Sequence, residues 1–122
     1  MDARTLEMIL KKYRYALWRT ELLEGYTSEN ISNEMMTLIE STIDILQGDK
    51  SRKGQKQYAI LHHTYFTQKS PTDTNEILDA LRSSGMSITT RTYFRLKSEA
   101  LEMIAKEIMI MFQSEMKKHN AF

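Results

Sequence analysis

The chain has 122 residues, of which 41% are hydrophobic and 27% are charged, and its formal net charge at pH 7 is +1. This length fits one compact domain, or one small domain with a helical appendage, and excludes a two-domain enzyme. Because the chain contains no cysteine, disulfide bonds, thiolate catalysis and sulfur-ligated metal sites are excluded as well.

The N-terminal region, residues 1–48, is predicted to form a helical hairpin that serves packing or oligomerisation. The chain has nine Met, four Gly and one Pro, a usage that favours helices and predicts an all-α fold. Apolar side chains recur at steps of three and four over residues 3–24 and again over residues 32–47. Gly25 and Gly48 follow these stretches as helix stops. Two helices with a short connection predict an antiparallel pair.

The polar and basic segment GDKSRKGQKQY, residues 48–58, is the predicted boundary between this hairpin and a DNA-binding region over residues 49–122. A third helix is expected from about residue 55 to residue 67, where apolar side chains return. A short fourth helix is expected after the only proline of the chain, with Thr72 or Thr74 as its N-cap.

A fifth and longer helix is expected to begin at Thr89 or Thr90, after the segment SSGMS, and to run to about Lys118. One stripe of this helix is predicted to face the core of the domain, and it consists of Tyr93, Leu96, Ala100, Leu101 and Ile104. The opposite side carries Thr90, Arg91, Phe94 and Arg95.

Charges alternate along the chain in blocks, although the net charge is small. Residues 27–48 contain four acidic residues and no Lys or Arg, whereas residues 49–69 contain five basic residues and one acid. Residues 70–81 contain three acids, and residues 82–97 contain four basic residues and no acid. Folding can bring the two basic blocks onto one face, where a local positive field attracts a polyanion. Solvated helix faces are the alternative explanation.

A helix, a turn that contains glycine, and a second helix that opens with hydroxyl and basic side chains are the sequence pattern of a helix-turn-helix. Residues 74–97, TNEILDALRSSGMSITTRTYFRLK, have this pattern. Arg91 and Arg95 are four residues apart, so they share one face of the helix and can bind the paired acceptors of guanine. An ordinary exposed face with two arginines is the alternative. The other candidate DNA-binding residues are Phe94, then Thr89, Thr90, Thr92 and Lys97 as phosphate contacts, and Arg52, Lys53 and Lys56 as a second basic contact.

Several segments after residue 57 match the pattern of one family. The matching residues are Tyr58, Ile60, Leu61, Tyr65 and Phe66, then Glu76, Ile77, Ala80 and Leu81, and then ITTRTYFRLKSEALEMIAKEI over residues 88–108. On these residues the chain resembles the phage late-gene regulators of the ArpU and RinA type, whose C-terminal half is similar to the promoter-binding helix-turn-helix of sigma factors. The resemblance implies a transcription regulator that acts on double-stranded DNA, with RNA polymerase as a further candidate partner.

One interval departs from the pattern of that family. The segment RSSGMS, from Arg82 to Ser87, lengthens the connection between the supporting helix and the recognition helix by several residues. The sequence therefore leaves open how the two helices are angled and how the longer turn affects DNA docking. The alternative function is a phage protein-interaction, packaging or adaptor module that uses a helix-turn-helix as its scaffold.

The residue types that support catalysis or metal binding are not spaced for it. His62 and His63 are adjacent, so on a helix they point about 100 degrees apart and do not chelate one ion. The sequence contains no glycine-rich phosphate loop and no nucleophile elbow. We therefore expect a non-enzymatic protein without cofactor or metal. The lack of a signal-peptide pattern and of a long apolar stretch predicts no membrane partner and a cytoplasmic location. The resemblance to phage regulators implies that the cell is a bacterial host.

Residues 100–112, ALEMIAKEIMIMF, carry more apolar side chains than one helical stripe accounts for. The N-terminal hairpin can cover them as core, or a second copy of the chain can cover them as a subunit interface, and the sequence supports both equally. A homo-oligomer is therefore a candidate assembly, in line with the paired half-sites that dimeric helix-turn-helix proteins read.

Overall fold

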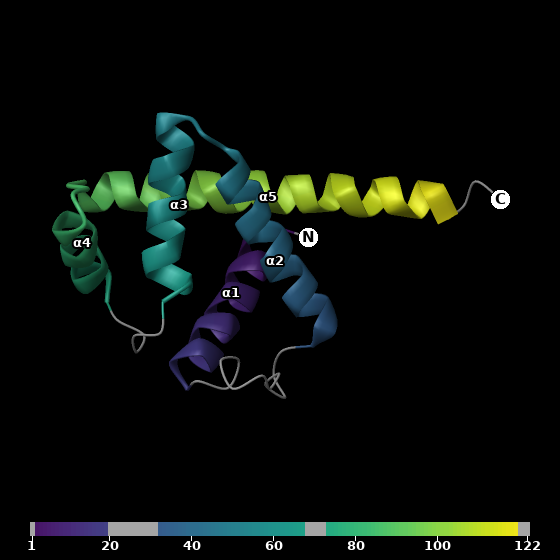
Figure 1. The fold of residues 1–122 in the computed structure, drawn as a ribbon, viewed down its shortest axis with the longest axis horizontal. Helices are drawn as coiled ribbons and strands as arrows, with labels where there is room; N and C mark the ends of the chain where they lie inside the picture. The colour runs from purple at the N-terminus through teal and green to yellow at the C-terminus, as the bar shows by residue number, and fades with distance from the viewer. Residues whose placement is uncertain (1, 20–31, 68–72, 120–122) are drawn as a thin grey trace.

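The computed structural model describes residues 2–19, 32–67 and 73–119, with the side chains of the last range described as far as residue 114. These residues form five α-helices and no strand, which confirms the all-α prediction (Figure 1). The helices are α1 (Ala3–Trp18), α2 (Asn33–Gly48), α3 (Arg52–Tyr65), α4 (Thr74–Ser83) and α5 (Thr90–His119).

The five helices begin with the same kind of cap. A short polar side chain before the first turn accepts a hydrogen bond from the backbone N–H three residues later, which satisfies a donor that the helix itself leaves unpaired. The acceptor and donor residues are Asp2 and Thr5, Ser32 and Met35, Ser51 and Gly54, Asp73 and Glu76, and Thr89 and Thr92. Local capping therefore fixes where each helix starts.

Three helix ends differ from the sequence prediction. α1 ends at Trp18 instead of residue 24, and residues 20–31 lie outside the described part of the chain. α3 begins at Arg52, three residues earlier than expected, because Ser51 caps it. Three basic residues of the predicted boundary, Arg52, Lys53 and Lys56, therefore belong to a helix. α4 is capped by the residue between the two expected threonines.

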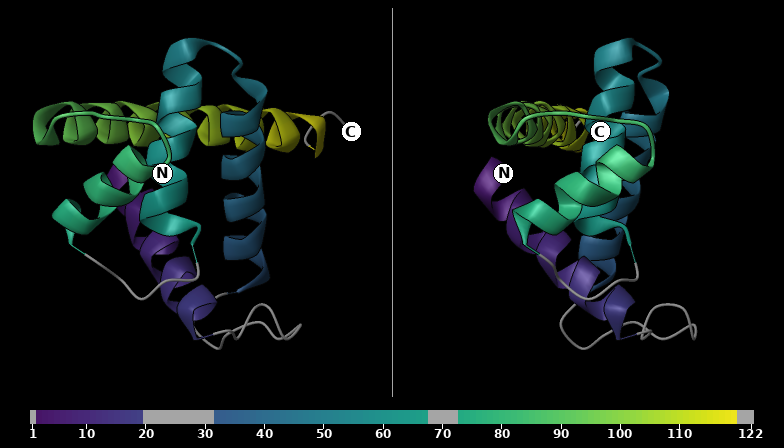
Figure 2. Two further views of the ribbon diagram at one scale, coloured as in Figure 1. Left: turned by 60° about the vertical axis from the view of Figure 1, so that its left-hand side comes forward. Right: turned by 90° about the vertical axis from the view of Figure 1, so that its left-hand side faces the viewer.

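The main core lies where α1, α2 and α3 pack against α5 (Figures 1 and 2). Its most buried side chains are Leu6, Leu10, Ile39, Leu46, Leu61, Tyr65, Ala100 and Ile104. Burial of this apolar surface is the main favourable term in folding, at about 25 cal/mol per Å² removed from water. The regions predicted on either side of Gly48 share this core, and the boundary between them stays a prediction.

A second, smaller cluster of buried side chains holds α4 against α3 and the beginning of α5. Its members are Ile60, Ile77, Leu78, Leu81, Tyr93 and Leu96. The amphipathic pattern of α4 accounts for this contact, because its three buried apolar residues fall on one face. α4 therefore lies beside the N-terminal end of α5 (Figure 2).

A buried arginine joins α1 to the end of α3. Arg14 is 6% exposed, and its guanidinium donates hydrogen bonds to the carbonyl oxygens of His63, at 3.0 Å, and Thr64. Carbonyls in the last turn of a helix have no partner within the helix, and a cation there is favourable. A side chain from one helix thus caps another.

The C-terminal part of α5 projects beyond the other helices (Figure 1). Ile104 and Ile108 are buried by the N-terminal helices, so the core explanation holds for this stretch. Ile110, Met111 and Phe112 are 50%, 49% and 59% exposed, respectively. No helix in the described ranges has both the length and the apolar content of a membrane span.

Candidate nucleic-acid interface

The turn between α4 and α5 has a regular, hydrogen-bonded geometry. The backbone N–H of Met86 donates to the carbonyl of Leu81 at 2.8 Å, and that of Gly85 donates to the carbonyl of Arg82 at 3.0 Å. This is the Schellman arrangement of helix ends, and it requires the left-handed backbone that Gly85 adopts at φ 99°. The glycine therefore ends α4 and turns the chain.

Apolar side chains on both sides of this turn anchor it to the second cluster. Met86 and Ile88 are partly buried against that cluster, which includes Tyr93. Ile88 precedes the cap of α5 and Tyr93 lies in its first turns, the two positions of a hydrophobic staple. Packing of Met86 and Ile88 therefore holds the long connection between α4 and α5 against the second cluster.

The first turn of α5 is closed by two threonines of the predicted site. The N–H of Thr92 donates to the hydroxyl oxygen of Thr89 at 3.1 Å, and the Thr89 hydroxyl donates to that of Thr92 at 3.0 Å. Two of the expected phosphate contacts, Thr89 and Thr92, therefore have a capping role within the helix. The backbone N–H groups at this helix start remain oriented for an anion.

α5 presents two different faces over its first three turns. Tyr93 and Leu96 are buried as predicted, whereas Arg91, Phe94 and Arg95 are exposed. Within the described ranges, neither guanidinium forms an ion pair. The two arginines thus stand together on the side of α5 that faces away from the core.

The buried side of the same turns is fixed by a hydrogen bond to α3. The hydroxyls of Tyr93 and Thr64 are 2.9 Å apart, and the Thr64 hydroxyl also lies 2.6 Å from the carbonyl oxygen of Ile60. Since Thr64 has one proton, which it gives to that carbonyl, Tyr93 is the donor between the two hydroxyls. Burial raises the pKa of Tyr93, so it stays protonated. This bond limits rotation of α5 against the domain.

The side chain of Lys97, an expected phosphate contact, is directed toward α1. The side chain is 18% exposed, and its ammonium lies 3.3 Å from the carboxylate of Glu7 on α1. The same carboxylate accepts a hydrogen bond of 2.5 Å from Tyr65 on α3. Lys97 also lies 5.2 Å from the ring centroid of Phe94. Lys97 therefore joins α1, α3 and α5, and does not belong to the exposed face with Arg91.

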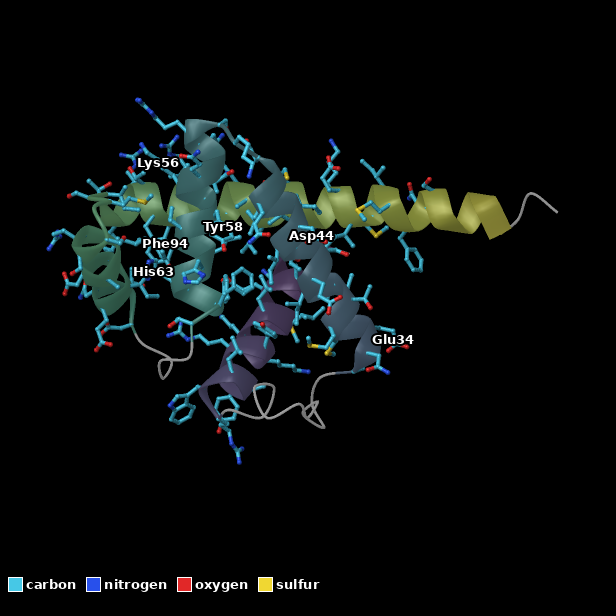
Figure 3. All side chains as sticks on the ribbon, viewed as in Figure 1. Glu34, Asp44, Lys56, Tyr58, His63 and Phe94 are labelled. Atoms are coloured by element: carbon cyan, nitrogen blue, oxygen red, sulfur yellow. The ribbon has the colours of Figure 1, made fainter. Side chains whose placement is uncertain are left out.

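The first turns of α3, which carry basic residues, lie next to α5. The sequence allowed for this, because the two basic blocks of the chain could fold onto one face. The ammonium of Lys53 is 2.9 Å from the carboxylate of Glu99, one turn after Arg95 on α5. Arg52 and Lys56 are exposed on the same turns of α3. Figure 3 shows Lys56 and Phe94 close to where α3 passes α5. Two basic segments separated by about forty residues in sequence thus adjoin.

Glu99 is the carboxylate within this basic surface. The hydrogen bond from Lys53 lowers the pKa of Glu99, and the charges of Lys53 and Arg95 lower it further. Glu99 is therefore ionised at neutral pH and offsets part of the positive charge around it. Sequence reasoning did not pair Glu99 with Lys53 or Glu7 with Lys97, because each pair joins helices that are distant in the chain.

His62 and His63 lie on α3, and a cavity lies apart from the exposed arginines of α5. No group of three or more His, Cys, Asp or Glu side chains there could hold a metal ion. His62 and His63 contact each other edge to face, with ring centroids 5.4 Å apart, and His62 stacks on Tyr58. A cavity of about 490 Å³ lies between α1, α3, α4 and α5, and Lys97 and Tyr93 are among its lining residues. It adjoins the inner side of α5.

No family model, curated protein or solved structure matches this chain. The resemblance to phage late-gene regulators therefore stays a prediction from the sequence.

Proposed function

We propose that this protein is a sequence-specific transcription regulator that binds double-stranded DNA through the exposed face of α5. In this proposal α4, the turn and α5 form a sigma-like helix-turn-helix, the N-terminal helices support it, and α5 enters the major groove. The phage late-gene role, with RNA polymerase as partner, rests on the resemblance of residues 58–108 to the ArpU and RinA regulators.

The observation that carries the proposal is the exposed pair Arg91 and Arg95, at the start of a helix whose other side is packed. A helix that reads DNA needs an anchored inner stripe and donors that project from its first turns. Arginine suits guanine because its two parallel N–H groups match the O6 and N7 acceptors of that base. Both requirements are met within residues 89–96.

Phosphate contacts fall to the neighbouring basic residues of α3. Arg52 and Lys56 are exposed, and Lys53 lies on the same turns but is held by Glu99. Contacts of this kind fix the protein on the duplex without reading its sequence. Since Lys97 is paired with Glu7, α3 is the source of charge in this proposal.

A binding titration tests the proposal. Duplexes with a randomised centre are selected on the protein, and the enriched duplex is titrated by fluorescence anisotropy at several salt concentrations. We expect Arg91→Ala and Arg95→Ala each to cost on the order of 1–3 kcal/mol of discrimination at one base pair. Arg52→Ala and Lys56→Ala should each reduce the salt slope by about 0.9 without changing the preferred sequence.

The matched control is Lys12→Ala, because Lys12 is an exposed cation on α1 and should change neither quantity. Circular dichroism should show unchanged helical content in all five variants. The proposal is wrong if no duplex binds even at low salt. If Arg91→Ala and Arg95→Ala weaken binding to every duplex equally, these arginines contact phosphates and do not read bases.

The protein-interaction alternative is favoured by one observation, the exposed apolar end of α5. Ile110, Met111 and Phe112 offer a surface that a DNA-binding role does not require. A phage adaptor or packaging subunit would use that surface and tolerate loss of Arg91 and Arg95. Pull-down of phage proteins by the wild type and by the double arginine variant separates the two functions.

A further inference from the structure

Phe94 is a large apolar side chain on the exposed side of α5, next to the two arginines of the predicted site. It is 45% exposed, although leaving a phenylalanine in water forgoes the stabilisation that its burial would give. On the helix it lies three residues after Arg91, so these two side chains share one face, and Arg95 is the next residue, about 100 degrees further around the helix. An apolar group in this place has no role in attracting phosphate.

The ring of Phe94 is held in place from one side. The ring of Tyr93 contacts it edge to face, with centroids 5.1 Å apart and planes at 73°. The ammonium of Lys97 lies 5.2 Å from its centroid and is itself bound to Glu7. Since these neighbours are fixed to the core, the ring is oriented in advance and its other side remains open.

The chemistry of the major groove identifies what this ring can contact. Base edges in that groove carry hydrogen-bond donors and acceptors, and the 5-methyl group of thymine is their apolar group. Phenylalanine is among the side chains that suit this methyl group. Because Phe94 lies between the two guanidiniums along the helix, its contact falls next to the bases that they bind.

We propose that Phe94 reads a thymine by its 5-methyl group, at a position adjacent to the guanines bound by Arg91 and Arg95. This inference rests on the proposed function, and it adds a defined base to the site that α5 recognises. Burial of one methyl group corresponds to about a three- to fivefold change in affinity.

Deoxyuridine provides the test, because it pairs as thymine does and lacks only the methyl group. Each thymine of the selected duplex is replaced in turn, and the dissociation constant is measured for the wild type, Phe94→Ala and Phe94→Leu. The wild type should lose about three- to fivefold at one thymine. Phe94→Ala should bind the thymine duplex more weakly and show no further loss with deoxyuridine there. Phe94→Leu, which keeps an apolar contact, should retain part of the sensitivity.

The outcomes separate this inference from the proposed function. If guanine substitutions weaken binding and no deoxyuridine substitution does, the thymine contact is refuted and DNA reading by the arginines stands. If Phe94→Ala keeps the full wild-type sensitivity to deoxyuridine, another residue reads the methyl group and the inference is wrong. If no duplex is selected at all, the proposed function fails and this inference fails with it. Thermal unfolding of each variant shows that the fold is intact.

Discussion

Glu99 limits the positive charge of the proposed DNA-binding surface at the level of a single residue. Its carboxylate binds Lys53 at 2.9 Å and lies near Arg95. A phosphate that approaches this surface must compete with the carboxylate for Lys53. The ion pair is partly exposed, so it contributes little to folding, and its main effect is on the field that DNA meets.

We therefore expect Glu99→Gln to increase the affinity for double-stranded DNA and to steepen the salt dependence by about 0.9 in slope, because Lys53 becomes available to a phosphate. Anisotropy titrations at several salt concentrations measure both quantities. Glu102→Gln is the control, since it removes an exposed carboxylate from the same helix. An equal gain in the two variants would show that net charge, and not release of Lys53, is responsible.

Arg14 stabilises the fold from a buried position. Its guanidinium binds two carbonyls at the end of α3, and hydrogen bonds to charged groups contribute about 2 kcal/mol. We expect Arg14→Met, which keeps much of the length of the side chain, to lower the free energy of unfolding by about 2 kcal/mol or more. Urea denaturation measures the change, and Lys12→Met on the exposed side of α1 should cost far less. If Arg14→Met leaves the free energy of unfolding unchanged, these hydrogen bonds make no net contribution to stability.

At the scale of elements, a carboxylate on α1 holds α3 and α5 together. Glu7 accepts a hydrogen bond from Tyr65 and binds Lys97. Burial acts to raise the pKa of Glu7, but the hydrogen bond from Tyr65 and the charge of Lys97 outweigh it and leave the pKa below its ordinary value of 4.5. A lowered pKa in the folded state means that ionised Glu7 favours folding.

The lowered pKa of Glu7 determines how the stability of the fold depends on pH. The contribution of Glu7 is fully present above about pH 5 and is lost as the pH falls through its folded pKa. We expect the difference in unfolding free energy between the wild type and Glu7→Gln to be largest at neutral pH and to shrink toward pH 3. Urea denaturation across this range measures it. Parallel pH profiles for the two proteins would contradict this role.

Helical periodicity predicted which residues of α5 face inward, and the structure confirms Tyr93, Leu96 and the rest of that stripe as buried. Periodicity orders residues within one helix, so it could not show which helix covers a face or which acid meets a base. The sequence therefore predicted Lys97 and Lys53 as DNA contacts but could not predict that each forms an ion pair with a glutamate. Glu7 lies far from Lys97 in sequence, and only the packing of α1 on α5 brings them together.

The turn between α4 and α5 was also only partly predictable from the sequence. Its glycine and its length were evident from residues 82–87, but the angle between the helices depends on tertiary contacts. Met86 and Ile88 supply these by packing on the cluster that α3, α4 and α5 share. The start of α5 was predictable because Thr89 caps it locally. The site was thus predictable within α5 and not across helices.

At the scale of the whole molecule, the end of α5 is left without a cover from the described helices. The core accounts for Ile108, whereas Ile110, Met111 and Phe112 stay about half exposed. We expect two copies of the chain to associate through this end, and a double contact with DNA would follow from it. The combined variant Ile110→Ser, Met111→Gln and Phe112→Ser should stay folded and sediment as a monomer at concentrations where the wild type does not. A wild type that is monomeric throughout would rule out this interface.

The most direct measurement of the central claim is methylation interference on the selected duplex. Dimethyl sulfate methylates guanine at N7 in the major groove and adenine at N3 in the minor groove, and the bound and free fractions are compared. If Arg91 and Arg95 read guanine from the major groove, N7 methylation at one or two guanines will block binding, and each arginine variant will lose one of these effects. Interference from adenine N3 alone, or from no base, would contradict major-groove reading by α5.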